Sequence, residues 1–397
     1  MTKKVVLAYS GGLDTSVAIP WLAEQGYEVI AVAVDVGQGG DLGAAVARAK
    51  TLGAIESRLV DARHDFATDY AFAALRMNAL YQGRYPLVSA LSRPLIARVL
   101  IDVAAETGAV AVAHGCTGKG NDQVRFEVSL AALAPDVEVL APVRDWGMTR
   151  ADTINYALER KLPITTTKSS PYSIDENLWG RSIECGVLED PWTAAPADVF
   201  ELTEAPQNAP AQPSEIEITF EAGIPTAVDG ETLDPVALMQ TLEKKVGAYG
   251  YGRVDMVEDR LVGIKSREIY EAPAALALIA AHADLEALTL ERAVARAKRE
   301  LDSRWADLVY EGLWFSPLRD AIDAFAATTA GYVSGDVRLR LTPGGCLPVA
   351  RRSDSSLYDT ALATYDEGDT FDQSDAAGFV RLWGLPAKTH AIRGKRK

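Results

Sequence analysis

Residues 8–16 read Ala-Tyr-Ser-Gly-Gly-Leu-Asp-Thr-Ser, and this stretch decides the fold. Residues 4–8 are short and apolar, as expected of a buried parallel strand, and residues 17–25 carry apolar side chains at helical spacing. The stretch is therefore predicted to be a loop between a strand and the start of a helix. Gly11 and Gly12 leave its backbone amides uncovered. Uncovered amides at a helix N-terminus attract anions, most often phosphate.

The spacing of these residues separates the loop from two common phosphate-binding motifs. It matches neither G-x-x-x-x-G-K-[ST] nor G-x-G-x-x-G. Ser-Gly-Gly-x-Asp-x-Ser after a first strand instead resembles the pyrophosphate loop of the ATP pyrophosphatases, which cleave ATP to AMP and pyrophosphate. The alternative is an ordinary glycine turn in which an acidic and a hydroxyl side chain cap the helix.

The composition is that of a soluble globular protein of two or three domains, with 397 residues, 48% hydrophobic and 24% charged. Uncharged apolar runs stay below about 18 residues and the N-terminus has no signal-peptide pattern, so we expect a cytoplasmic protein with no membrane partner. Three widely spaced cysteines predict neither a disulfide framework nor a zinc site. The net charge of −15 argues against a nucleic-acid partner.

Strands and helices alternate through the first 160 residues. This alternation predicts an α/β domain with a parallel, Rossmann-like sheet of the adenine nucleotide α-hydrolase type. If the strand order is 3-2-1-4-5, the loops after strands one and four share one crevice at the carboxyl edge. The predicted strands are residues 4–8, 28–35, 57–61, 109–114 and 137–141, with helices at 17–25, 41–53, 64–80 and 92–107.

The loop after the fourth strand carries a second unusual set of residues. Residues 114–126 read His-Gly-Cys-Thr-Gly-Lys-Gly-Asn-Asp-Gln-Val-Arg-Phe, with three glycines and charges of both signs. Such a set suits a zwitterionic ligand beside a phosphate. The alternative is a surface loop in which Asp122 caps the next helix.

The second half is predicted to be α+β. A proline-rich connector at 201–213 precedes a half-exposed strand. The predicted elements are a strand at 215–220, a helix at 235–249, helices from 268 to 330, a hairpin at 338–350 around Pro-Gly-Gly, and a helix at 373–383 followed by an unpaired tail.

Taken together, the two glycine-bearing loops resemble those of the argininosuccinate synthase family, which belongs to the ATP pyrophosphatase (HUP) superfamily. Four further stretches match it: residues 35–38, 93–95, 173–180 and 265–271. The resemblance extends from residue 4 to about residue 385 and implies a homotetramer. It also implies an ATP-binding domain at 1–165, a larger synthetase and multimerisation domain at 166–365, and a C-terminal oligomerisation arm at 366–397.

The resemblance also implies the site residues. ATP is assigned to Ala8, Tyr9, Ser10, Gly11, Gly12, Leu13, Asp14, Thr15, Ser16, Val34 and Gly115, with adenine against the backbone of Val34. Citrulline is assigned to Tyr85, Asn121, Arg125, Ser173, Ser182, Glu258 and Tyr270, and aspartate to Thr117, Asn121 and Asp122. Asp14 and Asp122 are the catalytic candidates, acting electrostatically or near Mg²⁺, whose ligands stay unassigned. Ala90 replaces a hydroxyl residue common in the family, and Ser89 or Ser92 is the candidate substitute.

The implied reaction has two steps. The ureido oxygen of citrulline attacks the α-phosphate of ATP, giving citrullyl-AMP and pyrophosphate, and the amine of aspartate then displaces AMP to form argininosuccinate. Two alternatives stay open: another synthetase of the ATP-pyrophosphatase type, and a non-catalytic adenine-nucleotide-binding protein.

Overall fold

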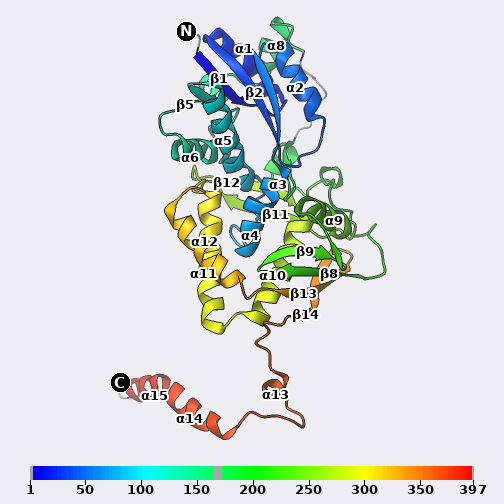
Figure 1. Ribbon diagram of the computed structural model, residues 1–397, viewed down its shortest axis with the longest axis vertical. Coiled ribbons are helices and arrows are strands. Elements are labelled where there is room, and N and C mark those ends of the chain that lie inside the picture. The colour runs from blue at the N-terminus through cyan, green and yellow to red at the C-terminus, as the bar shows by residue number, and fades with distance from the viewer. Residues whose placement is uncertain (1–2, 164–171, 396–397) are drawn as a thin grey trace. The chain divides into compact units, whose positions relative to one another are not determined.

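A computed structural model describes residues 3–163 and 172–395 (Figure 1). The predicted domain boundary between residues 165 and 166 lies outside the described residues. The chain divides into two compact units, Met1–Ser355 and Ser356–Lys397.

The first part of the larger unit is a five-stranded parallel sheet in the order β3-β2-β1-β4-β5, which confirms the predicted fold class and strand order. β1 lies between β2 and β4, with Val5 opposite both Val29 and Ala111. The strands are β1 (Lys3–Ala8), β2 (Tyr27–Asp35), β3 (Glu56–Asp61), β4 (Ala111–Ala113) and β5 (Glu138–Leu140).

Helices cover both faces of this sheet (Figure 1). Side chains alternate along β1, so Val5 and Leu7 pack with α1 and α2 while Val6 packs on the opposite face with α5. α5 begins at Val88, four residues before the predicted start. The helices are α1 (Leu13–Glu24), α2 (Leu42–Thr51), α5 (Val88–Thr107), α6 (Asp122–Leu133), α7 (Pro142–Asp145) and α8 (Arg150–Glu159).

The single helix predicted at 64–80 is three consecutive segments. They are α3 (Arg63–Asp65), the π-helix η1 (Phe66–Ala71) and α4 (Phe72–Arg76). Phe66, Tyr70 and Phe72 are buried on this stretch, so it anchors the sheet domain to the rest of the unit's core.

A four-stranded antiparallel sheet in the order β11-β12-β7-β6 follows. The sequence prediction was wrong here, because it placed the start of a helical region at residue 268, inside β12. β12 reads Lys-Ser-Arg-Glu-Ile-Tyr-Glu, and its buried Glu268 and Glu271 are paired with Arg260 and Arg181. The charged residues of β12 mask the alternation of apolar and polar side chains by which a strand is recognised in a sequence. The strands are β6 (Ser173–Asn177), β7 (Gly180–Glu184), β11 (Arg253–Asp259) and β12 (Lys265–Glu271), and short 3₁₀ turns η2 (Gly186–Glu189) and η3 (Ala197–Val199) follow β7.

A second antiparallel sheet, in the order β10-β9-β8-β13-β14, packs against helices. Its β13–β14 hairpin turns at residues 343–344, as predicted from Pro-Gly-Gly. The strands are β8 (Ser214–Glu221), β9 (Ile224–Val228), β10 (Glu231–Thr232), β13 (Gly335–Thr342) and β14 (Gly345–Arg352). The helices are α9 (Pro235–Gly247), α10 (Pro273–Thr289), α11 (Arg292–Tyr310) and α12 (Pro317–Ala330).

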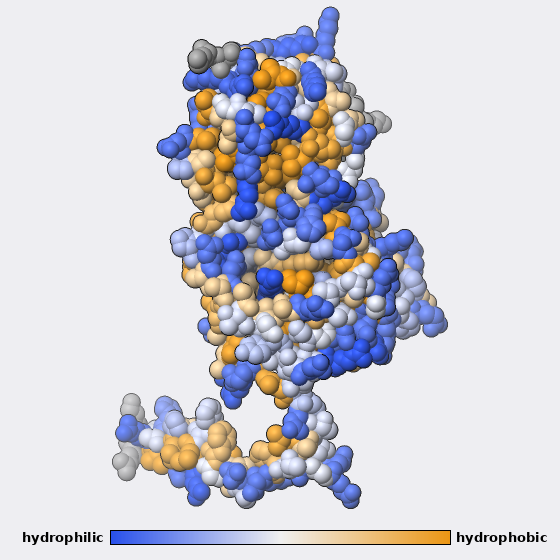
Figure 2. Space-filling view, viewed as in Figure 1, coloured by the Kyte–Doolittle hydropathy of each residue, from blue (hydrophilic) through white to orange (hydrophobic). Residues whose placement is uncertain are grey.

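The smaller unit contains α13 (Thr360–Ala363), α14 (Ser374–Trp383) and α15 (Leu385–Gly394), so the tail predicted to be unpaired is helical. None of these three helices has a buried residue. Phe379, Val380, Leu382 and Trp383 are 60–71% exposed, and Figure 2 shows hydrophobic residues open along this segment. Within the described ranges, no helix is long and apolar enough to cross a membrane.

Candidate active site

The first glycine-bearing loop has the backbone geometry of an anion-binding turn. Gly11 has φ +77°, and a Cβ on it would stand 2.9 Å from the Cβ of Ala45 in α2. Gly12 precedes α1 and makes no side-chain cap, so the first amides of that helix are left uncovered. Ser10 Oγ and Thr15 Oγ1 lie 3.1 Å apart across the loop.

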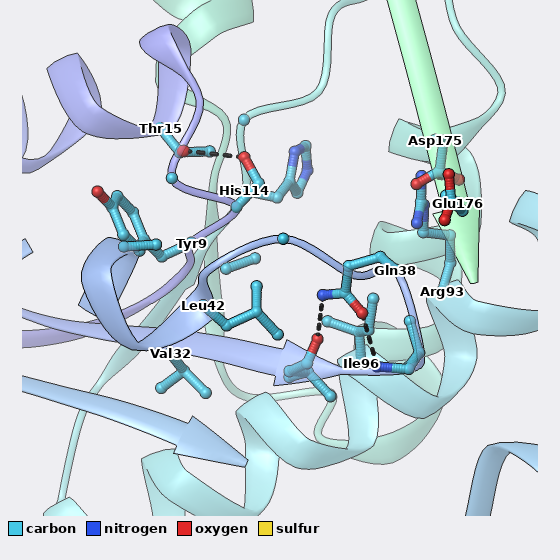
Figure 3. A pocket seen from close by; sticks show the side chains of 18 of the residues that line it. Tyr9, Thr15, Val32, Gln38, Leu42, Arg93, Ile96, His114, Asp175 and Glu176 are labelled. Atoms are coloured by element: carbon cyan, nitrogen blue, oxygen red, sulfur yellow. Dashed lines mark hydrogen bonds and ion pairs between the residues drawn. The ribbon is translucent and has the colours of Figure 1, made fainter. Parts of the chain in front are cut away.

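The second loop packs directly against the first. A Cβ on Gly115 would lie 2.8 Å from Cγ2 of Thr15, so only glycine allows this approach. Both loops line one cavity of about 550 Å³, which we call the nucleotide cavity. Figure 3 shows Thr15 and His114 on adjoining segments at one side of this cavity. The prediction that the loops after strands one and four share a crevice is therefore confirmed.

The nucleotide cavity has an apolar wall and a charged end. Val32, Val34, Ile96 and Phe126 contribute apolar surface to its lining. Gln38 shapes the loop after β2: its Nε2 donates to the carbonyl oxygen of Val34 and its Oε1 accepts from the amide of Val36, both at 2.8 Å (Figure 3). The apolar wall and the ordered Val34 backbone form a surface on which a flat heterocycle can lie.

Arg93, Asp175 and Glu176 lie at the charged end (Figure 3). Arg93 donates through Nε and Nη2 to Oδ2 of Asp122, at 2.9 and 2.7 Å, and through Nη2 to Oδ2 of Asp175 at 2.8 Å. Arg125 donates to the other oxygen of Asp122 at 2.8 Å. Burial raises the pKa of Asp122, but Arg93 and Arg125 outweigh it, so the pKa is lowered and the carboxylate is ionised at neutral pH.

A group of tyrosines surrounds Glu258 beyond this end, and we call it the tyrosine cluster. The hydroxyls of Tyr270 and Tyr310 lie 2.7 and 2.8 Å from the two oxygens of Glu258. Asn121 donates to the Tyr310 hydroxyl at 2.8 Å and accepts from the amide of Leu261 at 3.0 Å. Burial raises the pKa of Glu258, against hydrogen bonds from both tyrosines that lower it.

Of the two candidate substitutes for the hydroxyl absent at Ala90, Ser89 is the one whose side chain lies against a predicted citrulline residue, Ser182. Ser89 Oγ lies 3.2 Å from Oγ of Ser182, and its amide donates to the hydroxyl of Tyr85 at 2.9 Å. Ala90 is buried, and Ser92 donates to the carbonyl of Ser89. The ring of Tyr85 stacks on that of Tyr270 with centroids 4.2 Å apart, which places these residues beside the tyrosine cluster.

Most of the predicted site residues fall into these two neighbouring groups. Seven of the predicted ATP residues line the nucleotide cavity: Ala8, Tyr9, Ser10, Gly11, Thr15, Val34 and Gly115. Asp14 lies exposed in the first turn of α1 and Ser16 is buried 3.2 Å from the Tyr9 hydroxyl. Thr117 is exposed on the second loop, and Ser173 is exposed at the start of β6, two residues before Asp175.

Sequence reasoning missed four residues that organise the site: Gln38, Arg93, Asp175 and Tyr310. The first three lie within stretches that had been matched to the family, so that match was an available signal. Tyr310 ends a long helix, and no local pattern in the sequence distinguishes it from a core aromatic residue.

The carboxylates of the site are potential ligands of a metal ion. Within the described ranges, no three His, Cys, Asp or Glu side chains are grouped to hold an ion by themselves. This donor set fits Mg²⁺ that is held chiefly by phosphate oxygens and water, with at most one or two carboxylates from the protein.

Comparisons with known proteins agree on one family. Residues 4–163 match the model of the arginosuccinate synthase N-terminal HUP domain and residues 172–390 that of the arginosuccinate synthase C-terminal domain. An argininosuccinate synthase of Lactiplantibacillus plantarum (strain ATCC BAA-793 / NCIMB 8826 / WCFS1) is 55% identical over 388 residues, which are 98% of this chain and 94% of that protein.

Two solved structures match part of the chain. A predicted tRNA methyltransferase subunit of Methanocaldococcus jannaschii is 15% identical with a TM-score of 0.28, over 40% of this chain and 75% of that one. A 4-thiouridine synthetase in complex with RNA and ATP is 18% identical with a TM-score of 0.30, over 40% of each chain. Neither carries weight here. On the two family models and the close relative, the chain belongs to the argininosuccinate synthase family.

Proposed function

We propose that the nucleotide cavity binds ATP and that the tyrosine cluster binds citrulline, with aspartate entering between them at Asp122. Family membership fixes the overall reaction as ATP-dependent ligation of citrulline and aspartate to argininosuccinate, a step of arginine biosynthesis. The main observation behind this assignment of the substrates is the contact between the two glycine-bearing loops at Thr15 and Gly115.

The shape of the nucleotide cavity supports ATP as its ligand. The uncovered amides before α1 suit the β- and γ-phosphates, and the apolar wall near Val34 suits adenine. The carbonyl of Val34 accepts from Gln38 and keeps one lone pair for a donor on the base. In this arrangement the α-phosphate faces the charged end that contains Arg93.

The tyrosine cluster has groups for each part of citrulline. Arg125 is a buried guanidinium suited to an α-carboxylate, and Glu258 is a buried carboxylate suited to an α-ammonium. Glu258 is 3% exposed and accepts one hydrogen bond at each oxygen, from Tyr270 and Tyr310. Each oxygen therefore keeps a lone pair that the ammonium of citrulline can use.

The chain's contribution to both steps is positioning and charge stabilisation. In the first step a bond forms between the ureido oxygen and the α-phosphorus while the bond to pyrophosphate breaks, and the α1 amides stabilise the leaving charge. In the second step the aspartate nitrogen bonds to the ureido carbon and AMP leaves with the oxygen. Mg²⁺, when bound through the phosphates, neutralises charge on the leaving pyrophosphate. Asp122, held ionised by Arg93 and Arg125, is placed to attract the ammonium of aspartate.

The smaller unit supports a homotetramer. The open apolar side chains of α14 and α15 are those of a helix pair whose partner is another copy of the chain. We also place the protein in the cytoplasm, because its three cysteines are free.

The test measures pyrophosphate, AMP and argininosuccinate with citrulline, aspartate, both or neither. We expect argininosuccinate and AMP only with both amino acids. If the chain only binds the nucleotide, no pyrophosphate forms under any of these conditions. If the chain is a different synthetase, the release of pyrophosphate does not depend on citrulline.

The division of the site has its own test in the variant Glu258→Gln. We expect an increase of at least 10-fold in the KM for citrulline with little change in the KM for aspartate, because the ammonium loses its charged partner. Glu231→Gln, on the exposed strand β10, is the control. An unchanged KM for citrulline would place that substrate elsewhere.

A further inference from the structure

A second cavity, of about 520 Å³, shares no lining residue with the nucleotide cavity. It lies where η1, α4, α5 and α12 meet. Trp314, in the segment before α12, also lines it. We call it the arginine pocket, after Arg76, Arg98 and Arg319 in its lining.

The arginine pocket concentrates hydrogen-bond donors that have no acceptor. Ten buried side-chain nitrogen and oxygen atoms in the described residues have no hydrogen-bond partner, and three of them, all donors, belong to its lining: Tyr70 Oη, Arg76 Nε and Arg319 Nε. Tyr70 is 2% exposed, and burial raises its pKa to about 12, so its hydroxyl keeps its proton at neutral pH. A buried donor without an acceptor is destabilising by about 1–3 kcal/mol, and three in one cavity point to an acceptor that fills it.

Aromatic rings contact three of the polar side chains that line the pocket. Tyr70 stacks on Trp314 with ring centroids 4.5 Å apart, and the guanidinium of Arg319 lies 4.2 Å from the centroid of Trp314. Arg98 lies 5.4 Å from the ring of Phe315. Ring contacts therefore help to position Tyr70, Arg319 and the exposed Arg98 at the pocket.

Two of the three arginines of the pocket make no direct ion pair among the described residues, although four carboxylates lie around them. Arg319 is paired with Asp320 at 3.0 Å and with Asp323 at 3.3 Å. Arg76 and Arg98 make no ion pair within the described ranges. The remaining acidic groups that face the pocket are Asp69, whose carboxylate accepts from Thr68, and Asp65 near Tyr70.

We propose that the arginine pocket is a binding site for a small oxyanion, of the phosphate type, held by Arg76 and Arg98 and by a hydrogen bond from Tyr70. Guanidinium groups bind phosphate oxygens through paired N–H donors, and phosphate accepts enough hydrogen bonds to satisfy all three orphaned atoms. A carboxylate offers charge of the same sign but with fewer acceptor oxygens.

The test is a calorimetric titration of inorganic phosphate into the full-length chain. Ionic strength is held constant with chloride, and a non-hydrolysable ATP analogue fills the nucleotide cavity. We expect one saturable site per chain, weakened at least 10-fold in Arg76→Gln/Arg98→Gln and about 10-fold in Tyr70→Phe. Arg296→Gln, an exposed position on α11, should bind as wild type does. Malonate in a parallel titration distinguishes a carboxylate from a phosphate as the preferred ligand.

Two results would overturn the proposal. One is the absence of saturable binding of either anion to the wild-type chain. The other is equal binding to wild type and to the double variant, which would locate the anion elsewhere. Tyr70→Phe keeps the test independent of folding: because the hydroxyl has no protein partner, its removal should leave the thermal midpoint unchanged or higher. If the double variant only alters the sedimentation of the assembly, the pocket receives another copy and not a free anion.

Discussion

Replacing Arg93 by lysine tests the contact that orients Asp122. Arg93 makes three hydrogen bonds to carboxylates, two to Asp122 and one to Asp175. A lysine ammonium keeps the charge but can reach only one carboxylate well, so up to two of the three bonds are lost. Each is worth about 1.5–3 kcal/mol when buried.

The carboxylates of Asp122 and Asp175 are 28% and 32% exposed, so the full values do not apply and we expect about 2–3 kcal/mol in total. That energy corresponds to a loss of about 30- to 150-fold in kcat/KM for aspartate. The assay follows pyrophosphate release at saturating ATP and citrulline with aspartate varied, and Arg58→Lys, in an ion pair on β3, is the control. A loss of less than 3-fold would refute the role of Arg93 in positioning Asp122.

Three further perturbations follow from the structure. Gly11→Ala should weaken ATP binding at least 10-fold, because φ +77° and the 2.9 Å approach to Ala45 exclude a Cβ; equal affinity by calorimetry would show that the turn is not needed. Burial and nearby acids raise the pKa of Glu243 from 4.5 to about 7, so its contribution to stability is present below pH 4.5 and lost as the pH rises to about 7. Glu243→Gln should therefore gain about 1 kcal/mol over wild type in urea unfolding between pH 6 and pH 8, whereas a gain independent of pH would contradict the shift. Ending the chain at Ser355 should lower the mass of the sedimenting species, because the C-terminal unit carries the contacts of the proposed tetramer; an unchanged mass would show that this unit is not the assembly element.

The sheet domain could be predicted from the sequence because its signals are local. β1 and β2 are continuous apolar runs, and the loop at 8–16 follows the first of them, so strand order and crevice follow from general topology. The antiparallel sheet beyond it could not be predicted. β12 is held by ion pairs of Glu271 with Arg181, 90 residues away in the chain, and of Glu268 with Arg260, 8 residues away. The periodicity of a single strand does not reveal such partners.

The same distinction between local signals and distant contacts applies to the residues of the site. Gly11 and Gly115 are recognisable from their motifs, whereas Tyr310 reaches Glu258 only because α11 ends beside β11. The substitute for the hydroxyl lost at Ala90 depended on which neighbouring side chain faces Ser182. In the structure Ser89 faces Ser182, so Ser89 is the better candidate of the two.

The most direct test of the account uses citrulline labelled with ¹⁸O in its ureido group. If the nucleotide cavity holds the α-phosphate beside the tyrosine cluster, the ureido oxygen bonds to that phosphorus and leaves with it. Mass spectrometry should then find one ¹⁸O in each AMP and none in the pyrophosphate. Unlabelled AMP, or label in the pyrophosphate, would contradict the proposed juxtaposition of the two substrates.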